Sequence, residues 1–213
     1  MKEITENVVG YKEMNVPYTL VSHEDNSKNL AIFLPGVGYT VKSPLFHFSE
    51  DIFLNKSFDI LKVNYQYNEK KYDDYSMEEL SEAIKFDVKT VIDNVLTKYD
   101  YENFYIVGKS LGTIAMSSEL SRTIFKEAKV IWLTPLIHRS DVFNTMINSD
   151  NKGLCFIGDN DRCYTEERYN QLLNNTSIVS KLFPNVNHSM EYDNDTVGSI
   201  DLLKRVINDI KHF

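Results

Sequence analysis

The chain has 213 residues, of which 42% are hydrophobic and 25% are charged, an ordinary composition for a globular protein. Its formal net charge of −8 argues against a dedicated nucleic-acid binder, because no basic stripe is available to displace counterions from phosphates. The N-terminal residues lack the apolar core of a signal peptide, and no apolar run is long enough to cross a membrane. The two cysteines, Cys155 and Cys163, do not make a disulfide framework. We therefore expect a cytoplasmic protein without membrane or nucleic-acid partners, and the oligomeric state stays open.

The first third of the chain predicts strands. Residues 1–28 have the pattern of a polar β hairpin, with turn-forming residues at 24–27. The apolar run at 30–34 is continuous, as in a strand buried on both faces, and it ends in a Pro-Gly-Val-Gly loop at 35–38. A tyrosine-rich loop occupies 64–75. The strands expected in this part are 16–23, 30–34 and 58–63.

The rest of the chain alternates between helical and strand patterns. Ser76 and Glu79 form a capping box, and apolar residues then keep helical spacing to about Lys98. The remaining expected strands are 104–107, 129–133, 153–157 and 178–183, and the remaining expected helices are 111–120, 141–147, 166–173 and 200–210. This alternation predicts an α/β fold, a three-layer sandwich with a mainly parallel sheet and helices on both faces. We expect one domain over residues 1–213, because no repeat or linker interrupts the pattern.

The pentapeptide at 108–112, Gly-Lys-Ser-Leu-Gly, is typical of a nucleophile elbow, since it stands between a predicted strand and a predicted helix. A serine hydroxyl is a poor nucleophile unless it is exposed and close to a base, and a sharp turn would expose Ser110. Glycine at 108 and 112 avoids the side-chain collisions that so tight a turn would cause. The alternative is a glycine-flanked serine in an ordinary strand–helix connection.

Two further loops carry the groups that such a serine needs. In a parallel sheet, the loops at the carboxyl ends of the strands meet at one edge. His188 follows the last predicted strand and is the candidate general base and acid, although a lone loop histidine often has no function. Asp161, after the strand at 153–157, would orient the imidazole, and Asp159 competes with it for this role. Asp159 is otherwise a turn carboxylate.

The backbone N–H of Leu111 and an N–H of the loop at 35–38 would form an oxyanion hole, and Val37 is the expected donor in that loop. Gly36 and Gly38 would allow the backbone to approach a substrate closely. The loop could instead be a plain strand-ending turn.

The order Ser110, Asp161, His188, with the Pro-Gly-Val-Gly loop upstream, resembles the α/β-hydrolase superfamily over nearly the whole chain. It is most similar to the small, lidless members of the dienelactone-hydrolase and carboxylesterase type, because residues 134–152 leave room for one short helix and not for a cap. Two features depart from the pattern. Many relatives have histidine where Pro35 stands, a side chain that often braces the oxyanion loop, and dienelactone hydrolases have a cysteine nucleophile instead of a serine.

The resemblance implies a serine hydrolase that cleaves a small carboxylic ester or thioester through an acyl-enzyme, with no metal or organic cofactor. The alternatives are a non-catalytic binding or scaffolding protein that keeps the fold, and a peptidase or acyltransferase with the same triad. Lys109 is expected to be solvated or ion-paired, and Cys163 to be a packing thiol. The candidate pocket residues are Tyr39, Leu136, His138 and Met190, with Tyr65 and Tyr67 as further possibilities.

Overall fold

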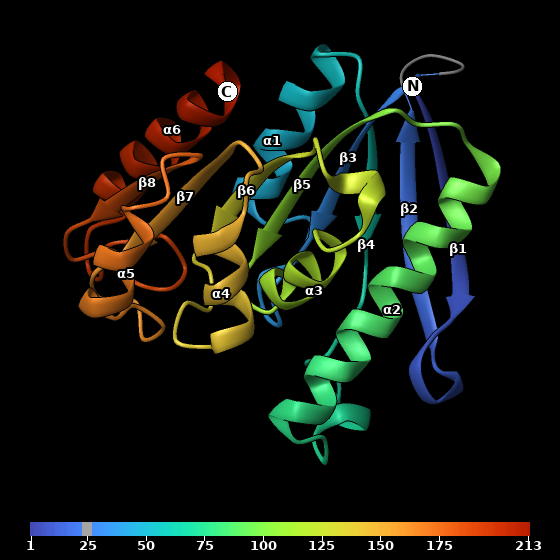
Figure 1. Cartoon of the computed structure of the whole chain (residues 1–213), viewed down its shortest axis with the longest axis horizontal. Coiled ribbons are helices and arrows are strands. Elements are labelled where there is room, and N and C mark those ends of the chain that lie inside the picture. Colours follow the sequence, from blue (N-terminus) through green and yellow to red (C-terminus); the bar gives the residue numbers. More distant parts are fainter. Residues whose placement is uncertain (23–26) are drawn as a thin grey trace.

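The computed structural model describes residues 1–22 and 27–213 and contains an eight-stranded sheet in the order β1-β2-β4-β3-β5-β6-β7-β8 (Figure 1). Strand β2 pairs antiparallel with both β1 and β4, and every other pair of neighbours from β4 to β8 is parallel. Among the described strands, β2 therefore runs against the common direction. The strands are β1 Lys2–Val9, β2 Asn15–Ser22, β3 Asn29–Leu34, β4 Asp59–Val63, β5 Asn103–Lys109, β6 Lys129–Leu133, β7 Gly153–Gly158 and β8 Ile178–Phe183.

A hairpin is present within the predicted region as β1 and β2, which pair with Thr5 opposite Thr19, but the chain reverses between them at residues 10–14 and not at the predicted turn. The end of the predicted strand at His23 and most of the turn predicted at 24–27 lie outside the described residues. The hairpin adds two strands to the edge of the sheet and leaves the carboxyl ends of β3 to β8 together.

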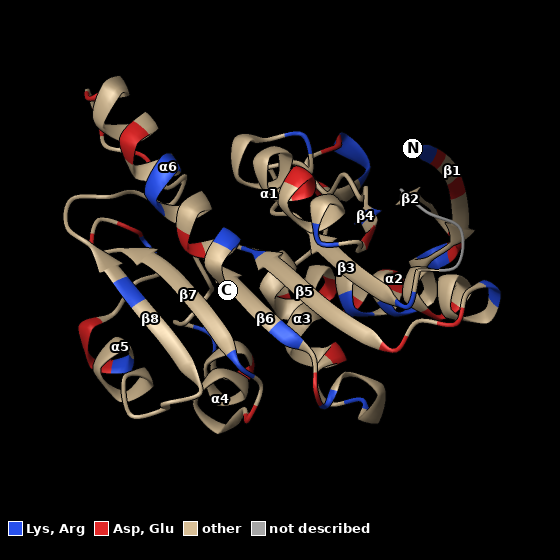
Figure 2. Ribbon diagram, turned by 90° about the horizontal axis from the view of Figure 1, so that it is seen from above, with Lys and Arg blue, Asp and Glu red and all other residues tan. Residues whose placement is uncertain are grey.

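Helices cover both faces of the sheet, as the alternation of strands and helices predicts. Figure 2 shows α1 and α6 on one side of the sheet and α3, α4 and α5 on the other. Two apolar cores result, one beneath α1 and α6 and one beneath α2 to α5. The helices are α1 Pro44–Asn55, α2 Met77–Lys98, α3 Gly112–Glu119, α4 Ser140–Asn148, α5 Glu166–Leu172 and α6 Thr196–His212. The three-layer α/β sandwich expected from the sequence is thus confirmed.

Helix α1 is an element that the sequence interpretation missed, since no helix was predicted between residues 39 and 58. Two signals for it are present: proline at the first helical position, Pro44, and buried side chains at Leu45, Ser49 and Phe53, four residues apart. The helix packs its apolar face on β3, where Phe33 contacts Phe53 with ring centroids 5.8 Å apart.

Two further predictions concern the N-terminal cap of α2 and the absence of a cap domain over the sheet. The Ser76 hydroxyl caps α2 by accepting a hydrogen bond from the Glu79 N–H at 3.2 Å, while the Glu79 carboxylate pairs with Lys12 of the hairpin region. Residues 134–152 contain α4 and no other helix, so the fold has no cap over the carboxyl ends of the strands, as predicted. No helix in the described part of the chain is both long and apolar enough to span a membrane.

Candidate active site

Ser110 occupies a sharp turn between β5 and α3. Its backbone φ is 49°, in the left-handed region that a residue with a side chain rarely adopts. A Cβ atom at Gly112 would lie 2.0 Å from the carbonyl oxygen of Leu34, and one at Gly108 would lie 2.7 Å from the Met116 sulfur. Gly112 is therefore required by contact with backbone atoms, whereas a larger residue at 108 would first have to displace the Met116 side chain.

Three loops bring Ser110, His188 and Asp161 together at the carboxyl edge of the sheet. The Ser110 Oγ lies 2.7 Å from His188 Nε2, and His188 Nδ1 lies 2.8 Å from each carboxylate oxygen of Asp161. A carboxylate can only accept, so Nδ1 carries the proton and Nε2 accepts from the Ser110 hydroxyl. The side chain of Asp161 is fully buried, whereas that of His188 remains 21% exposed. The hydroxyl is thus hydrogen-bonded to an imidazole that solvent can reach.

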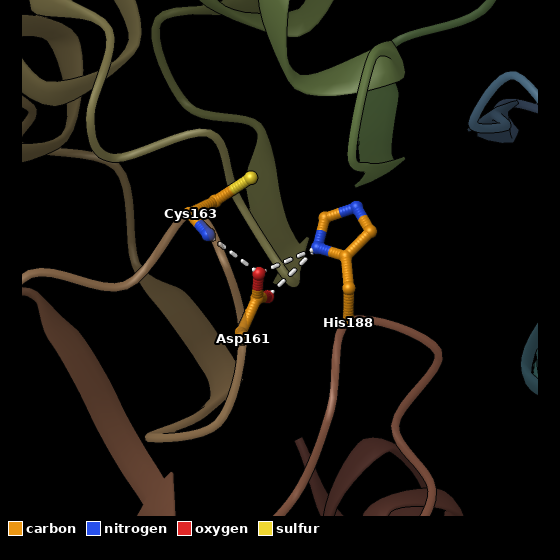
Figure 3. Close-up of side chains that lie close together, drawn as sticks. All are labelled: Asp161, Cys163 and His188. Carbon is orange, nitrogen blue, oxygen red and sulfur yellow. Dashed lines mark hydrogen bonds and ion pairs between the residues drawn. The ribbon is translucent and has the colours of Figure 1, made fainter.

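The Asp161 carboxylate lies between Cys163 and His188, as Figure 3 shows. Burial acts to raise the pKa of Asp161, but the hydrogen bonds from His188 and from the Cys163 N–H, at 2.8 Å, lower it below its ordinary value. Asp161 is therefore a carboxylate at neutral pH. The competing Asp159 is exposed and accepts a hydrogen bond from the Asn185 N–H at 2.6 Å, so it serves a turn and does not contact the histidine.

The loop after β3 lies against the turn at Ser110. A Cβ atom at Gly36 would lie 3.2 Å from the Ser110 Cβ, whereas one at Gly38 would meet no atom within 4 Å. The loop backbone therefore approaches the turn at Ser110 closely at Gly36, where a small residue is favoured, and not at Gly38. In the described part of the chain, the N–H groups of Val37 and Leu111 make no hydrogen bond, so both are available to an acceptor from outside.

The predicted pocket residues have different environments. The Tyr39 phenol oxygen accepts a hydrogen bond from the Leu45 N–H at 3.0 Å and so caps the start of α1. Leu136 is buried and donates its N–H to the Thr113 hydroxyl at 3.3 Å. His138 is exposed at the surface. Its pKa is lowered, first because part of the imidazole is desolvated and then because of the neighbouring arginine charges.

Met190 is buried and shares with Tyr39 a cavity of about 280 Å³ beside α6. Ile200 and Leu203 of α6 form another part of its wall. Tyr39 and Met190 thus line a hollow next to the histidine loop.

Lys109 corrects a sequence-based expectation, because it is neither solvated nor a surface ion pair. Only 1% of the residue is exposed. Its ammonium donates hydrogen bonds to the Thr134 hydroxyl at 2.7 Å and to the backbone carbonyl of His188 at 2.8 Å. It also lies 4.5 Å from the centre of the Tyr39 ring. Lys109 thus ties β5, the strand that precedes Ser110, to the loop that carries His188.

The alternation of side chains along β5 could have predicted this burial. Tyr105 and Val107 face the core beneath α1 and α6, and Lys109 continues the same alternate positions. Burial penalises the ammonium and lowers the pKa of Lys109 to about 8, although the negative charge of Asp161 partly opposes this shift.

Asp161, Cys163 and His188 also offer three potential metal-ligand atoms within 4.8 Å of one another. The Cys163 thiol fits this use poorly, because burial and then the Asp161 charge raise its pKa to about 11 and keep it protonated at neutral pH. The same His188 nitrogen and Asp161 oxygens already bond to each other. Cys163 is buried, as expected for a packing thiol.

Comparison with known proteins identified no matching family model and no matching curated protein. Solved structures do match over nearly the whole chain. XC6422 from Xanthomonas campestris, described as an α/β serine hydrolase without lid, is 12% identical with a TM-score of 0.72, over 99% of this chain and 93% of that one. The esterase Pf2001 from Pyrococcus furiosus is 13% identical with a TM-score of 0.71, over 100% and 93% of the two chains. Est1E from Butyrivibrio proteoclasticus with bound ferulic acid is 14% identical with a TM-score of 0.69, over 96% of each chain.

Likenesses at these identities show the fold. The chain has the α/β-hydrolase fold in its lidless form, which confirms the resemblance seen in the sequence.

The contact at Gly112 predicts the effect of one added methyl group. Gly112→Ala should destabilise the protein by about 1–3 kcal/mol or more, because the new Cβ would overlap the backbone of Leu34. Gly38→Ala is the matched control and should change stability by less than about 0.5 kcal/mol, since the space around Gly38 is open. Urea unfolding of both variants measures the difference, and equal stabilities would contradict the steric explanation of the turn.

The buried ammonium of Lys109 predicts how stability depends on pH. The pKa of Lys109 is about 8 in the folded protein and lies near 10.5 when the chain is unfolded. Above pH 8 the folded state releases this proton while the unfolded state keeps it, so the wild type gains stability with rising pH. Relative to Lys109→Met, the gain between pH 7 and pH 9.5 should be about 2 kcal/mol.

Urea unfolding at both pH values measures this gain. Lys42→Met, the same substitution at an exposed lysine, is the control and should keep the wild-type pH dependence. A pH dependence in Lys109→Met equal to that of the wild type would show that the Lys109 ammonium is not perturbed.

Proposed function

We propose that the protein is a serine hydrolase that cleaves a small carboxylic ester or thioester through an acyl-enzyme. The observation that carries this proposal is the unbroken hydrogen-bonded chain from Ser110 through His188 to Asp161. Its geometry is that of a nucleophile, a general base and an orienting carboxylate. The left-handed backbone at Ser110 supports the same assignment, because strained residues are concentrated at functional sites.

In the proposed first step, the Ser110 oxygen attacks the carbonyl carbon of the substrate as His188 Nε2 takes the hydroxyl proton. The imidazolium that results is stabilised by the ionised Asp161. His188 then returns the proton to the leaving alcohol or thiol, and the C–O or C–S bond breaks to leave the acyl group on Ser110. Water, activated by the same imidazole, attacks the acyl-enzyme and releases the carboxylic acid.

The negative charge on the carbonyl oxygen during both attacks needs donors that are already in place. The free N–H groups of Val37 and Leu111 would supply them, one from the loop after β3 and one from the start of α3. These side chains and N–H groups would supply every role in acyl transfer, so the proposed reaction needs no resident cofactor.

The site is open to a substrate, because it lies at the edge of a sheet that no cap covers and both Ser110 and His188 are partly exposed. The structural neighbours support a small molecule as that substrate. Among the structural neighbours, Pf2001 is described as an esterase and Est1E binds ferulic acid, a carboxylic acid of the kind that ester hydrolysis releases.

Replacing the nucleophile tests the proposal directly. Ser110→Ala should lower ester or thioester hydrolysis by about a thousandfold or more, because no covalent intermediate can form. The stability of Ser110→Ala should not fall below that of the wild type, since the substitution removes only the hydroxyl that faces His188. The measurement is turnover of p-nitrophenyl esters and of an acyl-thioester panel by both proteins, with fluorophosphonate labelling as a second readout.

Hydrolysis at the wild-type rate in Ser110→Ala would refute Ser110 as the nucleophile. A wild type that neither turns over these substrates nor takes the fluorophosphonate would favour a binding protein. Labelling of Ser110 without ester or thioester turnover would favour a peptidase or an acyltransferase.

The two aspartates after β7 provide a matched pair. Asp161→Asn should lower the turnover rate by about 10³- to 10⁴-fold, because the amide would favour the wrong imidazole tautomer. Asp159→Asn should leave the rate within about twofold of the wild type, since that carboxylate serves only the turn at Asn185. Steady-state kinetics of the two variants measure this difference. A larger loss in Asp159→Asn would assign the acid to Asp159.

A further inference from the structure

The loop that carries Val37 begins with Pro35, which cannot donate a hydrogen bond. Proline has no N–H and no polar side chain, so Pro35 contributes only its carbonyl oxygen to hydrogen bonding. That oxygen accepts a hydrogen bond from the phenol of Tyr65, which comes from the loop after β4. The other side of the same peptide unit, the Gly36 N–H, donates to the Tyr39 carbonyl at 3.1 Å. The Pro35–Gly36 peptide is therefore held at both ends.

The next N–H along the chain is that of Val37, the proposed oxyanion donor. Its direction follows from the plane of the preceding peptide and the two backbone torsions of Gly36, because the peptide units themselves are rigid. The Pro35 carbonyl also lies close to the nucleophile turn, since a Cβ at Gly112 would come within 2.8 Å of its oxygen. A rotation of the Pro35–Gly36 peptide would thus move the donor and disturb its contact with the turn.

Tyr65 is itself fixed on all sides. The residue is 6% exposed, and its ring packs on that of Tyr67, with ring centroids 5.0 Å apart and an interplanar angle of 34°. The Tyr67 hydroxyl donates to Asp87 of α2 at 2.5 Å, and the same carboxylate accepts the Tyr11 N–H at 2.6 Å. The tyrosine-rich loop is therefore anchored to a long helix, and Tyr65 reaches from that anchor to the Pro35 carbonyl.

We propose that Tyr65 is a positioning residue for the oxyanion hole. Its phenol holds the Pro35–Gly36 peptide through the Pro35 carbonyl and so fixes the position of the Val37 N–H. This inference rests on the proposed serine hydrolase function. Tyr65 does not touch the substrate; it acts through the peptide that precedes the donor. Because burial raises the pKa of Tyr65 well above its ordinary value, the phenol keeps its proton and donates throughout the working pH range.

The experiment compares two buried tyrosines whose hydroxyls donate to different parts of the fold. Tyr65→Phe removes only the hydroxyl that reaches Pro35, and Tyr101→Phe removes only the hydroxyl that reaches Asp59 at the start of β4. Tyr65→Phe should lower kcat about tenfold with KM changed by less than about twofold, because the loss falls on a group that acts in the transition state. Tyr101→Phe should keep kcat within about twofold. Melting curves verify that both variants are folded.

A second readout does not depend on turnover. In ¹⁵N-labelled protein, the Val37 amide signal should shift or broaden in Tyr65→Phe and stay at its wild-type position in Tyr101→Phe. An unchanged kcat and Val37 signal in Tyr65→Phe would overturn the inference, and equal losses of kcat in both variants would reduce Tyr65 to a purely structural role. A wild type without hydrolase activity would instead refute the proposed function, and the Val37 signal would then report only on the loop.

Discussion

The turn at Ser110 is the constraint on which the site depends. A left-handed residue at the end of a buried strand is tolerated only when its neighbours leave room for the reversal, and Gly108 and Gly112 leave that room. The absence of a side chain at Gly112 lets the start of α3 approach the backbone of β3 at Leu34. The same contact brings the loop after β3 beside the serine, so one steric requirement places both the hydroxyl and its neighbouring N–H donors.

Two buried polar groups hold the loops on either side of this turn. Lys109 binds the backbone carbonyl of His188, and Tyr65 binds that of Pro35. Both donate to main-chain carbonyls, so each loop is linked by a hydrogen bond to a buried side chain. The arrangement has a cost, because burial of the Lys109 ammonium opposes folding at neutral pH. A lidless fold makes such support useful, since no cap presses on the loops from outside.

Much of the fold could be predicted because its signals are local. Parallel strands in α/β proteins are apolar runs, and their alternation with amphipathic helices is visible in the sequence. Helix α1 escaped prediction because its apolar side chains are interleaved with polar ones after a glycine-containing loop, and its first turn is capped by Tyr39 from outside the helix. The sequence does carry a start signal, Ser43 before Pro44, but the Ser43 side chain makes no capping hydrogen bond, and Tyr39 supplies the cap instead.

By itself, the sequence determined the class of fold, the turn at Ser110 and the order of the candidate serine, acid and base, because glycine spacing and strand–helix alternation follow from local sterics and hydrophobic pattern. It left Asp159 and Asp161 as competitors, since both stand in the same short loop. Only the tertiary structure decided which of them reaches His188, and only it showed that Lys109 is buried. These facts depend on distances between strands far apart in the chain, which no local pattern encodes.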